Sequence, residues 1–584
     1  MSTGKFRVCC GKIDEYMHQY NAQCAWLTGY SHFIGSIVIT LDQVVLWTDD
    51  RYEAQVRSEL VCDNWLLIRH DGTKMPVALA EWIASKLDIR SSYNKVGMSA
   101  QYTSFHSWSS MKDELMIWNV SLVAVTELFH RTDPDNPVYV HNITFAGISW
   151  EKKVETIARL INAQSAQGLV VTELDEIAWL FNVRGSDILY RPFFRARAFV
   201  HVNQTTHLWM NTSQLVSDAR IQLANVDIQP YDAFLSTLDA LVNGSAINKI
   251  WVTQSAAQEI VERIPASKRF ISGSPIERTK AVKNPTEQKG MRESSIRDSV
   301  ARVKHLNWLQ NEIKNDRPVN ETQAAEKLEY FQSQQAYFKG ISFETISAVG
   351  ANAAVIHFQP KPPTAVQITK DKVYLLDAGA QYLDGTTDVT RTHTFGTPTV
   401  EEKKAYTLVL QGAIDLADAV FPEGTYGRQL DILARQSLYK NSMDYAHSTG
   451  HGIGHFLHIH EGPSFIGMGY TVRDMPLTDG MVFSDEPGFY LPDNFGIRLE
   501  THIMVKNYTL PNNYANSTTQ FLHFEPFTFV PFDGNLIVCE MLTKTQLIWL
   551  NRYHQEVRRV LETTGQLNSE ELTYLKETTQ YISC

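Results

Sequence analysis

The run from Val373 to Phe395 limits what this chain can fold into more than any other stretch, because it has the pattern of a β-hairpin. Its first part, up to Leu376, is apolar and β-forming, and Asp384-Gly385 is a strong signal for a two-residue turn. Its last part, from Thr386 onward, is rich in Thr and aromatic residues, which favour strands. The pattern therefore predicts two antiparallel strands joined by a tight turn.

Two aspartates lie on this hairpin, and the predicted register places them on one face. With a two-residue loop at the turn, Asp377 is expected to face Thr392, and Asp388 lies an even number of residues from Thr392. The two carboxylates are still offset along the ladder, and a bulge at Gly379 would shift them further. Parity thus predicts a shared site without deciding whether both carboxylates bind one ion.

Three later segments carry side chains of the same chemistry. One is a Gly-rich stretch with five histidines, at positions 447, 451, 455, 458 and 460. Another places Glu486 before Pro-Gly, and the third runs from Gly496 to His502. In this third segment apolar residues alternate with Arg498, Glu500 and His502, which predicts one strand that buries one face and presents a carboxylate on the other.

The candidate site residues follow one another in a characteristic order: Asp377, Asp388, His451, Glu486 and Glu500. With the motifs Asp-Gly-Thr-Thr-Asp, Gly-His-Gly-Ile-Gly, His-Glu-Gly-Pro, Asp-Glu-Pro-Gly and Gly-Ile-Arg-Leu-Glu, this order resembles the pita-bread metallopeptidases, most closely the eukaryotic Xaa-Pro aminopeptidase (aminopeptidase P) group. The resemblance extends from about Asp14 to the C-terminus. It implies an α/β (α+β) fold with two similar creatinase-type domains, 1–148 (with a truncated start) and 149–283, followed by a pita-bread catalytic domain, 284–584.

The resemblance also implies a role for each ligand in a site with two metal ions. Asp377 would bind one ion, His451 and Glu486 the other, and Asp388 and Glu500 would bridge the two. A water shared by the ions would become a hydroxide near neutral pH and attack the scissile carbonyl, with Glu486 carrying its proton to the leaving nitrogen.

Electrostatics supports the presence of cations. Two like charges about 4 Å apart cost on the order of 4 kcal/mol at an effective dielectric near 20, so four carboxylates in one cleft need neutralisation. Two divalent ions carry four positive charges against those four carboxylates. Oxygen-rich ligands with one imidazole favour Mn²⁺, with Co²⁺ or Zn²⁺ as alternatives in vitro. The competing hypothesis is an acid cluster satisfied by Arg391 and Arg498.

Two patterns within the family select different histidines as the ligand. The aminopeptidase P pattern places it nine residues before the His of His-Glu-Gly-Pro, which selects His451, whereas the prolidase pattern places it directly before Phe-Leu, which selects His455. We favour His451, although relatives usually have a small residue where this chain has His455. His458 and His502 are interpreted as structural.

Three further residues match family positions that contact substrate. His357 and His460 correspond to histidines that bind the substrate and stabilise the tetrahedral oxyanion. Arg51 corresponds to an arginine that reaches the catalytic cleft from the N-terminal domain, but Asp50 stands where relatives usually have Gly. The competing interpretations are a core histidine for His357 and a surface arginine for Arg51.

The function implied is an aminopeptidase that releases the first residue from peptides with Pro at position 2. An Xaa-Pro bond lacks an N–H and is held by a ring, so it needs a site that does without that donor. A prolidase restricted to dipeptides is the runner-up. A peptide-binding protein without activity and a metal-free creatinase-type hydrolase are disfavoured because all five ligands are present.

Helix-start signals mark the other units. Ser149 is the expected N-cap of a helix from Trp150 to Ile161, and the sequence Asn-Pro-Thr-Glu from Asn284 predicts the start of a longer one. A capping box at Thr399 predicts a helix that continues to a stop at Pro422.

Composition excludes some classes of partner. A net charge of -11 argues against a nucleic-acid surface, and no apolar run is long enough to span a bilayer. Six scattered cysteines predict reduced thiols, whereas eight Asn-x-Ser/Thr sequons hint at secretory ancestry. The compartment therefore stays open: cytoplasmic if the chain is complete, secreted or membrane-associated if a signal is missing. Relatives are often dimers, so a homodimer is expected.

Overall fold

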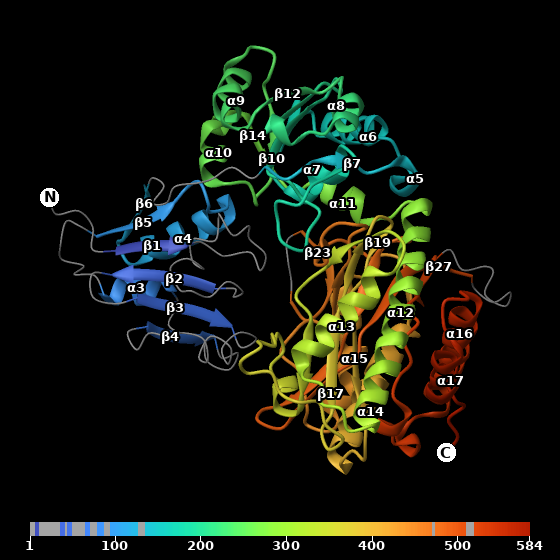
Figure 1. Cartoon of the computed structure of the whole chain (residues 1–584). Coiled ribbons are helices and arrows are strands. Elements are labelled where there is room, and N and C mark those ends of the chain that lie inside the picture. Colours follow the sequence, from blue (N-terminus) through green and yellow to red (C-terminus); the bar gives the residue numbers. More distant parts are fainter. Residues whose placement is uncertain are drawn as a thin grey trace. The chain divides into compact units, whose positions relative to one another are not determined.

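The computed structural model describes residues 6–10, 35–40, 44–49, 65–70, 79–86, 94–125, 135–469, 473–509 and 519–584. The chain divides into two compact units, one of residues 1–141 with 148–276 and one of residues 142–147 with 277–584. Figure 1 colours the chain from its N-terminus to its C-terminus. Each unit is described here by itself.

The first unit begins with a six-stranded sheet in the order β4-β3-β2-β1-β5-β6. Its strands are β1 (Phe6–Cys10), β2 (Gly35–Thr40), β3 (Val44–Asp49), β4 (Trp65–His70), β5 (Lys95–Ser99) and β6 (Ser121–Val125). The helices α3 (Leu79–Lys86) and α4 (Phe105–Ile117) supply buried residues to the core that this sheet shares.

A second six-stranded sheet in the same unit has the order β12-β11-β10-β8-β13-β14. Its strands are β8 (Gly168–Val171), β10 (Ala196–His201), β11 (Thr206–Met210), β12 (Asp227–Pro230), β13 (Ile250–Val252) and β14 (Arg269–Ile271), with β7 (Tyr139–Val140) and β9 (Val183–Arg184) as a separate pair. The accompanying helices are α6 (Trp150–Ala163), α7 (Leu174–Leu180), α8 (Ser217–Gln222), α9 (Phe234–Asn243) and α10 (Gln258–Arg263).

The two sheets share one topology. When the strands of each sheet are numbered by their order in the chain, their order across the sheet is 4-3-2-1-5-6 in both cases. Each neighbouring pair is also antiparallel or parallel in the same way in both sheets. The prediction of two similar α/β domains is therefore confirmed. Ser149 caps α6 as expected, with its hydroxyl accepting from the backbone N–H of Lys152.

The second unit contains the hairpin and the other candidate ligands. Its sheets have the orders β15-β18-β19, β16-β17-β20, β21-β28-β27-β24-β22-β23 and β25-β26. The strands are β15 (Phe338–Ile341), β16 (Ile346–Val349), β17 (Tyr374–Ala378), β18 (Ala380–Tyr382), β19 (Gly385–Thr386), β20 (Val389–His393), β21 (Val420–Pro422), β22 (Gly450–Gly452), β23 (Glu461–Ile466), β24 (Val482–Asp485), β25 (Gly488–Leu491), β26 (Phe495–Arg498), β27 (Thr501–Tyr508) and β28 (Phe521–Pro526).

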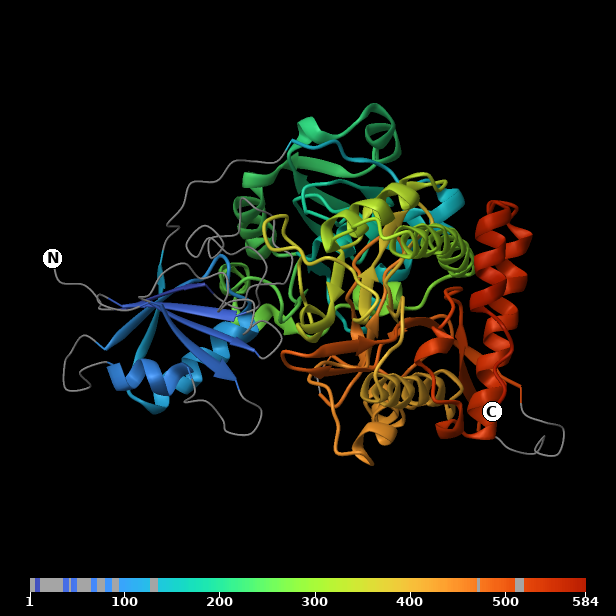
Figure 2. The same cartoon turned by 60° about the horizontal axis from the view of Figure 1, so that its bottom comes forward.

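Helices pack on these sheets and close the core. They are α5 (Ile143–Ala146), α11 (Pro275–Ala281), α12 (Pro285–Lys314), α13 (Glu321–Ser333), α14 (Val400–Ala417), α15 (Gly427–Tyr439), α16 (Lys544–Thr563) and α17 (Ser569–Thr578). The largest hydrophobic cluster joins residues of α14, α16 and the six-stranded sheet. In Figures 1 and 2, α16 and α17 run side by side along the second unit. Among the described residues, no helix is long and apolar enough to cross a membrane.

The predicted helix starts are confirmed, but one predicted end is wrong. Asn284 and Glu287 form a capping box at the start of α12, and Thr399 and Glu402 form another at the start of α14. The latter helix ends at Ala417 instead of continuing to Pro422, which lies in β21 and pairs with Phe521. Strand pairing in the six-stranded sheet therefore ends the helix before the proline is reached.

The hairpin is present, but its predicted register is two residues out. Tyr382 pairs with Gly385, so the turn residues are Leu383 and Asp384, and Asp377 faces Thr390 instead of Thr392. The register stays continuous through Gly379, without a bulge. An even shift preserves parity, so both aspartates still lie on one face, and they are closer along the ladder than predicted.

The single strand predicted from Gly496 to His502 is two strands. The pairing partner of the strand changes after Arg498: β26 pairs with β25, whereas β27 pairs with β24 and β28. Both sets of alternating residues in this segment are buried, so the face that carries Arg498, Glu500 and His502 is enclosed as fully as the apolar face. Glu500 lies between the two strands, where its backbone N–H donates to the carbonyl of Thr390 at 3.0 Å and its carboxylate lies beside those of Asp377 and Asp388.

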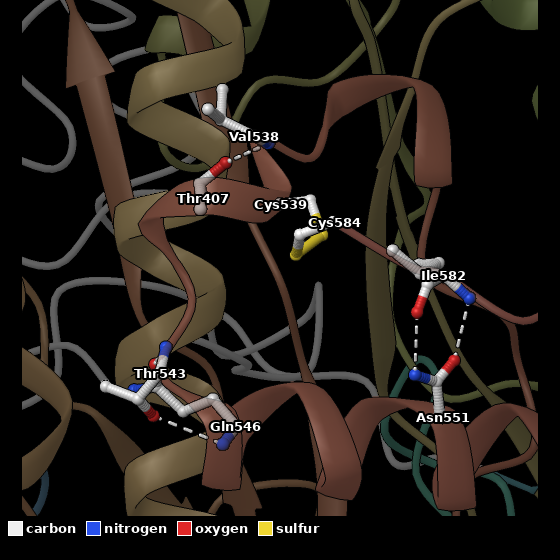
Figure 3. The surroundings of a disulfide bond; sticks show 8 residues. All are labelled: Thr407, Val538, Cys539, Thr543, Gln546, Asn551, Ile582 and Cys584. Carbon is white, nitrogen blue, oxygen red and sulfur yellow. Dashed lines mark hydrogen bonds between the residues drawn. A yellow bond between two sulfur atoms is a disulfide. The ribbon is translucent and has the colours of Figure 1, made fainter.

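The prediction of reduced thiols is wrong for two of the cysteines. Cys539 and Cys584 form a disulfide, with Cα atoms 5.4 Å apart, that joins positions 45 residues apart in sequence (Figure 3). Close by, the Asn551 amide accepts from the backbone N–H of Ile582 at 2.8 Å and donates to its carbonyl at 3.0 Å. The C-terminal segment is therefore joined covalently to the 3₁₀ turn Cys539–Met541, which precedes α16, and by hydrogen bonds to α16 itself.

Candidate metal centre

The five predicted ligands come from five places in the second unit. Asp377 lies in β17, Asp388 directly precedes β20, His451 is the middle residue of β22, Glu486 directly follows β24, and Glu500 lies between β26 and β27. Backbone bonds join these parts, since Glu500 N–H donates to Thr390 O at 3.0 Å and Glu486 N–H donates to Thr449 O at 2.7 Å. The sheets thus bring together residues up to 123 positions apart, Asp377 and Glu500.

Potential ligand atoms converge in three overlapping groups, each with all atoms within 4.8 Å of one another. The groups are Asp377 with Asp388 and Glu500; His451 with Glu486 and Glu500; and Asp388 with His451 and His460. Asp388, His451 and Glu500 each belong to two groups. Such sharing is what two neighbouring cation sites need, because a bridging ligand must reach both ions.

The donor atoms at this centre suit divalent cations. Asp377 Oδ1 and Glu500 Oε1 are buried and have no hydrogen-bond partner in the protein. His451 Nε2 lies 3.4 Å from Asp388 Oδ2 and 3.5 Å from Glu486 Oε1, longer than a good charge-assisted hydrogen bond. Buried carboxylate oxygens without donors are costly, so these atoms need a positive partner.

The electrostatics of the centre lead to the same requirement. Burial raises the pKa of Asp388, Glu486 and Glu500 well above ordinary carboxyl values. Neighbouring carboxylates raise each pKa further: Asp377 acts on Asp388, Glu500 on Glu486, and Asp388 on Glu500. Both effects oppose ionisation of these carboxyl groups, and a neighbouring pair of cations would act in the opposite direction.

Arginine neutralises only part of this cluster. Arg498 donates to Asp377 Oδ2 at 2.6 Å and to the Tyr490 hydroxyl at 2.8 Å. Arg391 instead bonds backbone carbonyls, those of Glu500 and Val530 among them. In the competing hypothesis these two arginines neutralise the acid cluster. They bond only one carboxylate oxygen of the five predicted ligands, Asp377 Oδ2.

The histidines of the Gly-rich stretch occupy different places. The rings of His451 and His460 lie 4.2 Å apart, edge to face, beside Asp388. His455 is 2% exposed and belongs to none of the three groups; it lies against α12, where a Cβ on Gly290 would come 3.0 Å from its Nε2. His458 Nδ1 accepts from the backbone N–H of His460 at 3.0 Å, a structural contact.

Two further histidines contact residues of the centre: His502, interpreted from the sequence as structural, and His447, which was given no role. His502 Nε2 accepts from the backbone N–H of Asp388 at 2.9 Å, so it holds the segment that carries this carboxylate. His447 Nε2 lies 2.8 Å from the Tyr490 hydroxyl, and its Nδ1 lies 3.9 Å from Glu486. Burial, reinforced by Arg498, lowers the pKa of His447 well below its usual value. Both lie within four residues of a predicted ligand, which was the only signal in the sequence.

The remaining substrate-contact candidates differ in how far the structure describes them. His357 is half-buried beyond a 3₁₀ turn (Gly350–Ala354), near enough that its charge contributes to the low pKa of His447. Arg51 and its neighbour Asp50 lie outside the described residues.

Comparison with known proteins identifies the family. Residues 289–507 match metallopeptidase family M24, and residues 520–582 match the C-terminal region of that peptidase. Residues 11–133 and 130–287 match two creatinase/prolidase N-terminal domains. A probable Xaa-Pro aminopeptidase P from Laccaria bicolor is 38% identical over 93% of this chain and 86% of its own length. The chain belongs to metallopeptidase family M24.

Within M24, a second curated relative and a solved structure agree. A probable Xaa-Pro aminopeptidase P from Paracoccidioides lutzii is 38% identical over 97% of this chain and 95% of its own length. The X-prolyl aminopeptidase of Caenorhabditis elegans, a cytosolic enzyme with a di-nuclear active site, superposes with a TM-score of 0.93 at 31% identity over 99% of this chain and 95% of its own. The resemblance noted in the sequence, to the aminopeptidase P group, is confirmed.

A more distant M24 structure shows the fold alone. The Xaa-Pro dipeptidase from Bacillus anthracis gives a TM-score of 0.51 at 22% identity, over 66% of this chain and 99% of that one. About a third of this chain therefore has no counterpart in the dipeptidase.

Proposed function

We propose that this M24 protein is an Xaa-Pro aminopeptidase, a hydrolase that cleaves the bond between the first residue and a proline at position 2 of a peptide. The observation that carries the proposal is the convergence of five residues, in the family's order, into overlapping groups of ligand atoms. The two relatives and the C. elegans structure, each similar over most of the chain, support the same activity.

The centre would hold two divalent cations, with Mn²⁺ the metal that an oxygen-rich set with one imidazole favours. Asp377 would bind one ion, His451 and Glu486 the other, while Asp388 and Glu500 would bridge them. When bound, such a pair supplies a nucleophile from water at neutral pH and polarises the scissile carbonyl. Unpartnered oxygens on Asp377 and Glu500 support this assignment.

The chain's own groups would do the remaining work. Glu486 would accept the proton of the attacking water and deliver it to the leaving nitrogen of proline. His357 and His460 would donate to the substrate carbonyl and to the oxyanion that develops from it, and Arg51 would bind the peptide. Arg498 and Tyr490 hold Asp377 in place.

Proline specificity follows from what such a site does not require. The scissile Xaa-Pro amide has no N–H, and its ring fixes φ near -65°. Cleavage that depends on the carbonyl oxygen and a protonated leaving nitrogen needs no amide donor from the substrate. Peptides with Pro at position 2 are therefore the expected substrates.

We further propose that the chain is organised as domains 1–148, 149–283 and 284–584 and that it assembles as a homodimer. The capping box at Asn284 supports the last boundary, and the helix cap at Ser149 supports the first. Sedimentation of the purified protein tests the assembly.

Two observations bear on the compartment in opposite directions. The C. elegans relative is a cytosolic enzyme, whereas the Cys539–Cys584 disulfide is typical of proteins in oxidising compartments. The intact mass of protein isolated from its own cells, before and after thiol alkylation and glycosidase treatment, decides between them.

A dipeptide-restricted prolidase is the second candidate, because prolidases share the catalytic fold. The extra third of this chain favours the aminopeptidase. Mass-spectrometric digestion of Xaa-Pro, Xaa-Pro-Xaa and longer peptides, with and without a chelator, tests both. We expect chelator-sensitive release of the first residue from the longer peptides. Cleavage of the dipeptide alone would identify a prolidase, and no cleavage would refute both.

A further inference from the structure

A second cluster of buried charges lies outside the candidate metal ligands. Lys280 Nζ donates to Glu461 Oε2 at 2.8 Å, and Lys283 Nζ donates to Glu461 Oε1. The side chains of Lys280 and Glu461 are 1% exposed, and that of Lys283 is 2% exposed. Lysine and glutamate are almost never buried this fully unless they are paired. We call these three residues the Glu461 triad.

Glu461 stands at a sensitive place in the sheet. It directly follows His460 and is the first residue of β23, which is the edge strand of the six-stranded sheet. Among the described strands, the one that pairs with it is β22, which contains His451. An edge strand is held by a backbone ladder on one side only, so its position depends on what contacts it from outside the sheet.

The ladder between β22 and β23 is irregular next to the histidines. His451 pairs with Phe465, but the next residue, Gly452, pairs with Glu461, so residues 462–464 have no partner between these pairs. Such a bulge interrupts the ladder and re-aims the strand. One backbone pair, Gly452 with Glu461, joins the two strands next to His451 and His460, whose rings lie 4.2 Å apart, and residues 462–464 give this pair no ladder support on one side.

The lysines are themselves fixed to another strand of the centre. Lys280 lies in the last turn of α11, and Lys283 lies between α11 and α12. Lys283 N–H donates to Gly480 O at 3.0 Å, and its carbonyl accepts from Gln288 Nε2 at 2.8 Å. Gly480 lies just before β24, which leads to Glu486. The segment that presents the lysines is thus anchored beside that strand.

We infer that the Glu461 triad is the positioning element of the histidine side of this centre: two buried lysine side chains hold the Glu461 carboxylate, and thereby the single backbone pair beside the bulge that joins the segments of His460 and His451. The triad touches neither substrate nor ion and acts through the backbone of β23. The inference deepens the proposed function and rests on it for the roles of the two histidines.

The first test replaces Glu461 with Gln, which keeps the shape and removes the charge that the lysines hold. Loss of an outer partner of a metal site typically costs about 10- to 100-fold in activity or metal affinity. We therefore expect kcat for an Xaa-Pro-Xaa peptide to fall by that factor with little change in KM, and Mn²⁺ affinity, measured by competition with a chelating dye, to fall as well.

A matched control removes an ion pair of the same unit that lies elsewhere. Glu525→Gln breaks the bidentate contact with Arg292, whose two N–O distances are 2.7 and 2.6 Å, on α12 and β28. We expect this variant to keep the wild-type kcat and Mn²⁺ affinity. Equal losses in both variants would mean that Glu461 is merely a stability contact, and would overturn the inference.

A readout independent of activity separates this inference from the proposed function. Hydrogen exchange of the peptide covering residues 450–466 is expected to speed up in Glu461→Gln and to stay unchanged in Glu525→Gln. If Glu461→Gln does not fold, Lys280→Met, which leaves the Lys283 contact, is expected to show the same changes at smaller size. Wild-type exchange, kcat and Mn²⁺ affinity in a folded triad variant would overturn the inference. Absence of Xaa-Pro cleavage by the wild type would refute the proposed function alone.

Discussion

The candidate centre is built from two pairs of strands, here called arms, which hold their side chains in place in different ways. The hairpin arm, β17 and β20 with Asp377 and Asp388, has an unbroken register from Tyr374 with His393 to Ala378 with Val389. The histidine arm, β22 and β23 with His451 and His460, has a bulge between the pair His451 with Phe465 and the pair Gly452 with Glu461. A regular ladder places side chains by its own geometry, whereas a bulged one needs external contacts.

Both arms are also held by side chains, but at different points. In the hairpin arm, Arg302 of α12 donates to the carbonyl of Ala378, and His502 accepts from the backbone N–H of Asp388. These contacts add to a ladder that is already complete. In the histidine arm, the Lys280 and Lys283 contacts hold Glu461, the first residue of β23, directly beside the bulge. Changes that spare the ladder should therefore be tolerated better in the hairpin arm.

The largest effect is expected from the hairpin arm's shared ligand. Asp388→Ala removes a carboxylate from two of the three ligand groups, so the second cation loses its bridge. Loss of metal-based stabilisation of several kcal/mol corresponds to about 10³-fold or more in kcat/KM. Turnover of an Xaa-Pro-Xaa peptide and metal analysis check this, and wild-type turnover by the variant would contradict the proposed roles.

A pair of variants sharpens the assignment in the histidine arm. His451→Ala removes a ligand shared by two groups, and we expect about a 10²-fold or greater loss in kcat/KM and weaker Mn²⁺ binding. His455→Ala leaves those groups intact and is expected to keep Mn²⁺ binding, with unfolding free energy lower by about 1–3 kcal/mol. The reverse outcome would select the prolidase-like ligand, His455.

A smaller effect is expected from crowding the hairpin arm. A Cβ at Gly379 would meet the carbonyl oxygen of Thr387 and the hydroxyl of Ser342. Gly379→Ala should lower the unfolding free energy by about 1–3 kcal/mol and reduce turnover, because Thr387 directly precedes Asp388. Gly534→Ala is the matched control, since its Cβ would meet only Ile582 Cδ1 at 4.0 Å. Denaturant unfolding of both variants gives the comparison, and equal stability would contradict it.

The smallest effect on turnover is expected outside both arms. Replacing Cys539 and Cys584 together with Ser removes a cross-link that encloses a long loop, and this should lower the unfolding free energy by about 3 kcal/mol. The two Asn551 bonds to Ile582 remain, and neither arm is touched. Thermal unfolding and turnover check this, and a fall in kcat of the folded variant would show that the tail acts on the centre.

Sequence reasoning succeeded where the determining chemistry is local. The capping boxes of α12 and α14 combine residues three positions apart, and their starts are where the pattern placed them. The ligand order was recognisable for a similar reason, because each motif is a short run of residues on one strand or turn. The prediction that Asp377 and Asp388 lie on one face of the hairpin also needed only local information, because side chains alternate between the two faces of a strand.

The errors arose where distant contacts decide. Asp384-Gly385 was taken as the turn, but Gly385 lies in the ladder, paired with Tyr382, and it packs so closely on α12 that a Cβ there would collide with Ser294. The break between β26 and β27, just before Glu500, could not be predicted from the alternation of apolar and polar residues, because both faces of that segment are buried. The disulfide joins residues 45 apart, and spacing alone does not select that pair from six cysteines.

The most direct test of the whole account is a titration of metal-free protein with Mn²⁺. Bound metal and turnover of an Xaa-Pro-Xaa peptide are followed together, with Asp388→Ala as the control. The account predicts negligible turnover without metal, two ions bound per chain at saturation, and full turnover once both are bound. Full turnover by metal-free protein would contradict it, and so would the absence of bound metal in the presence of excess Mn²⁺.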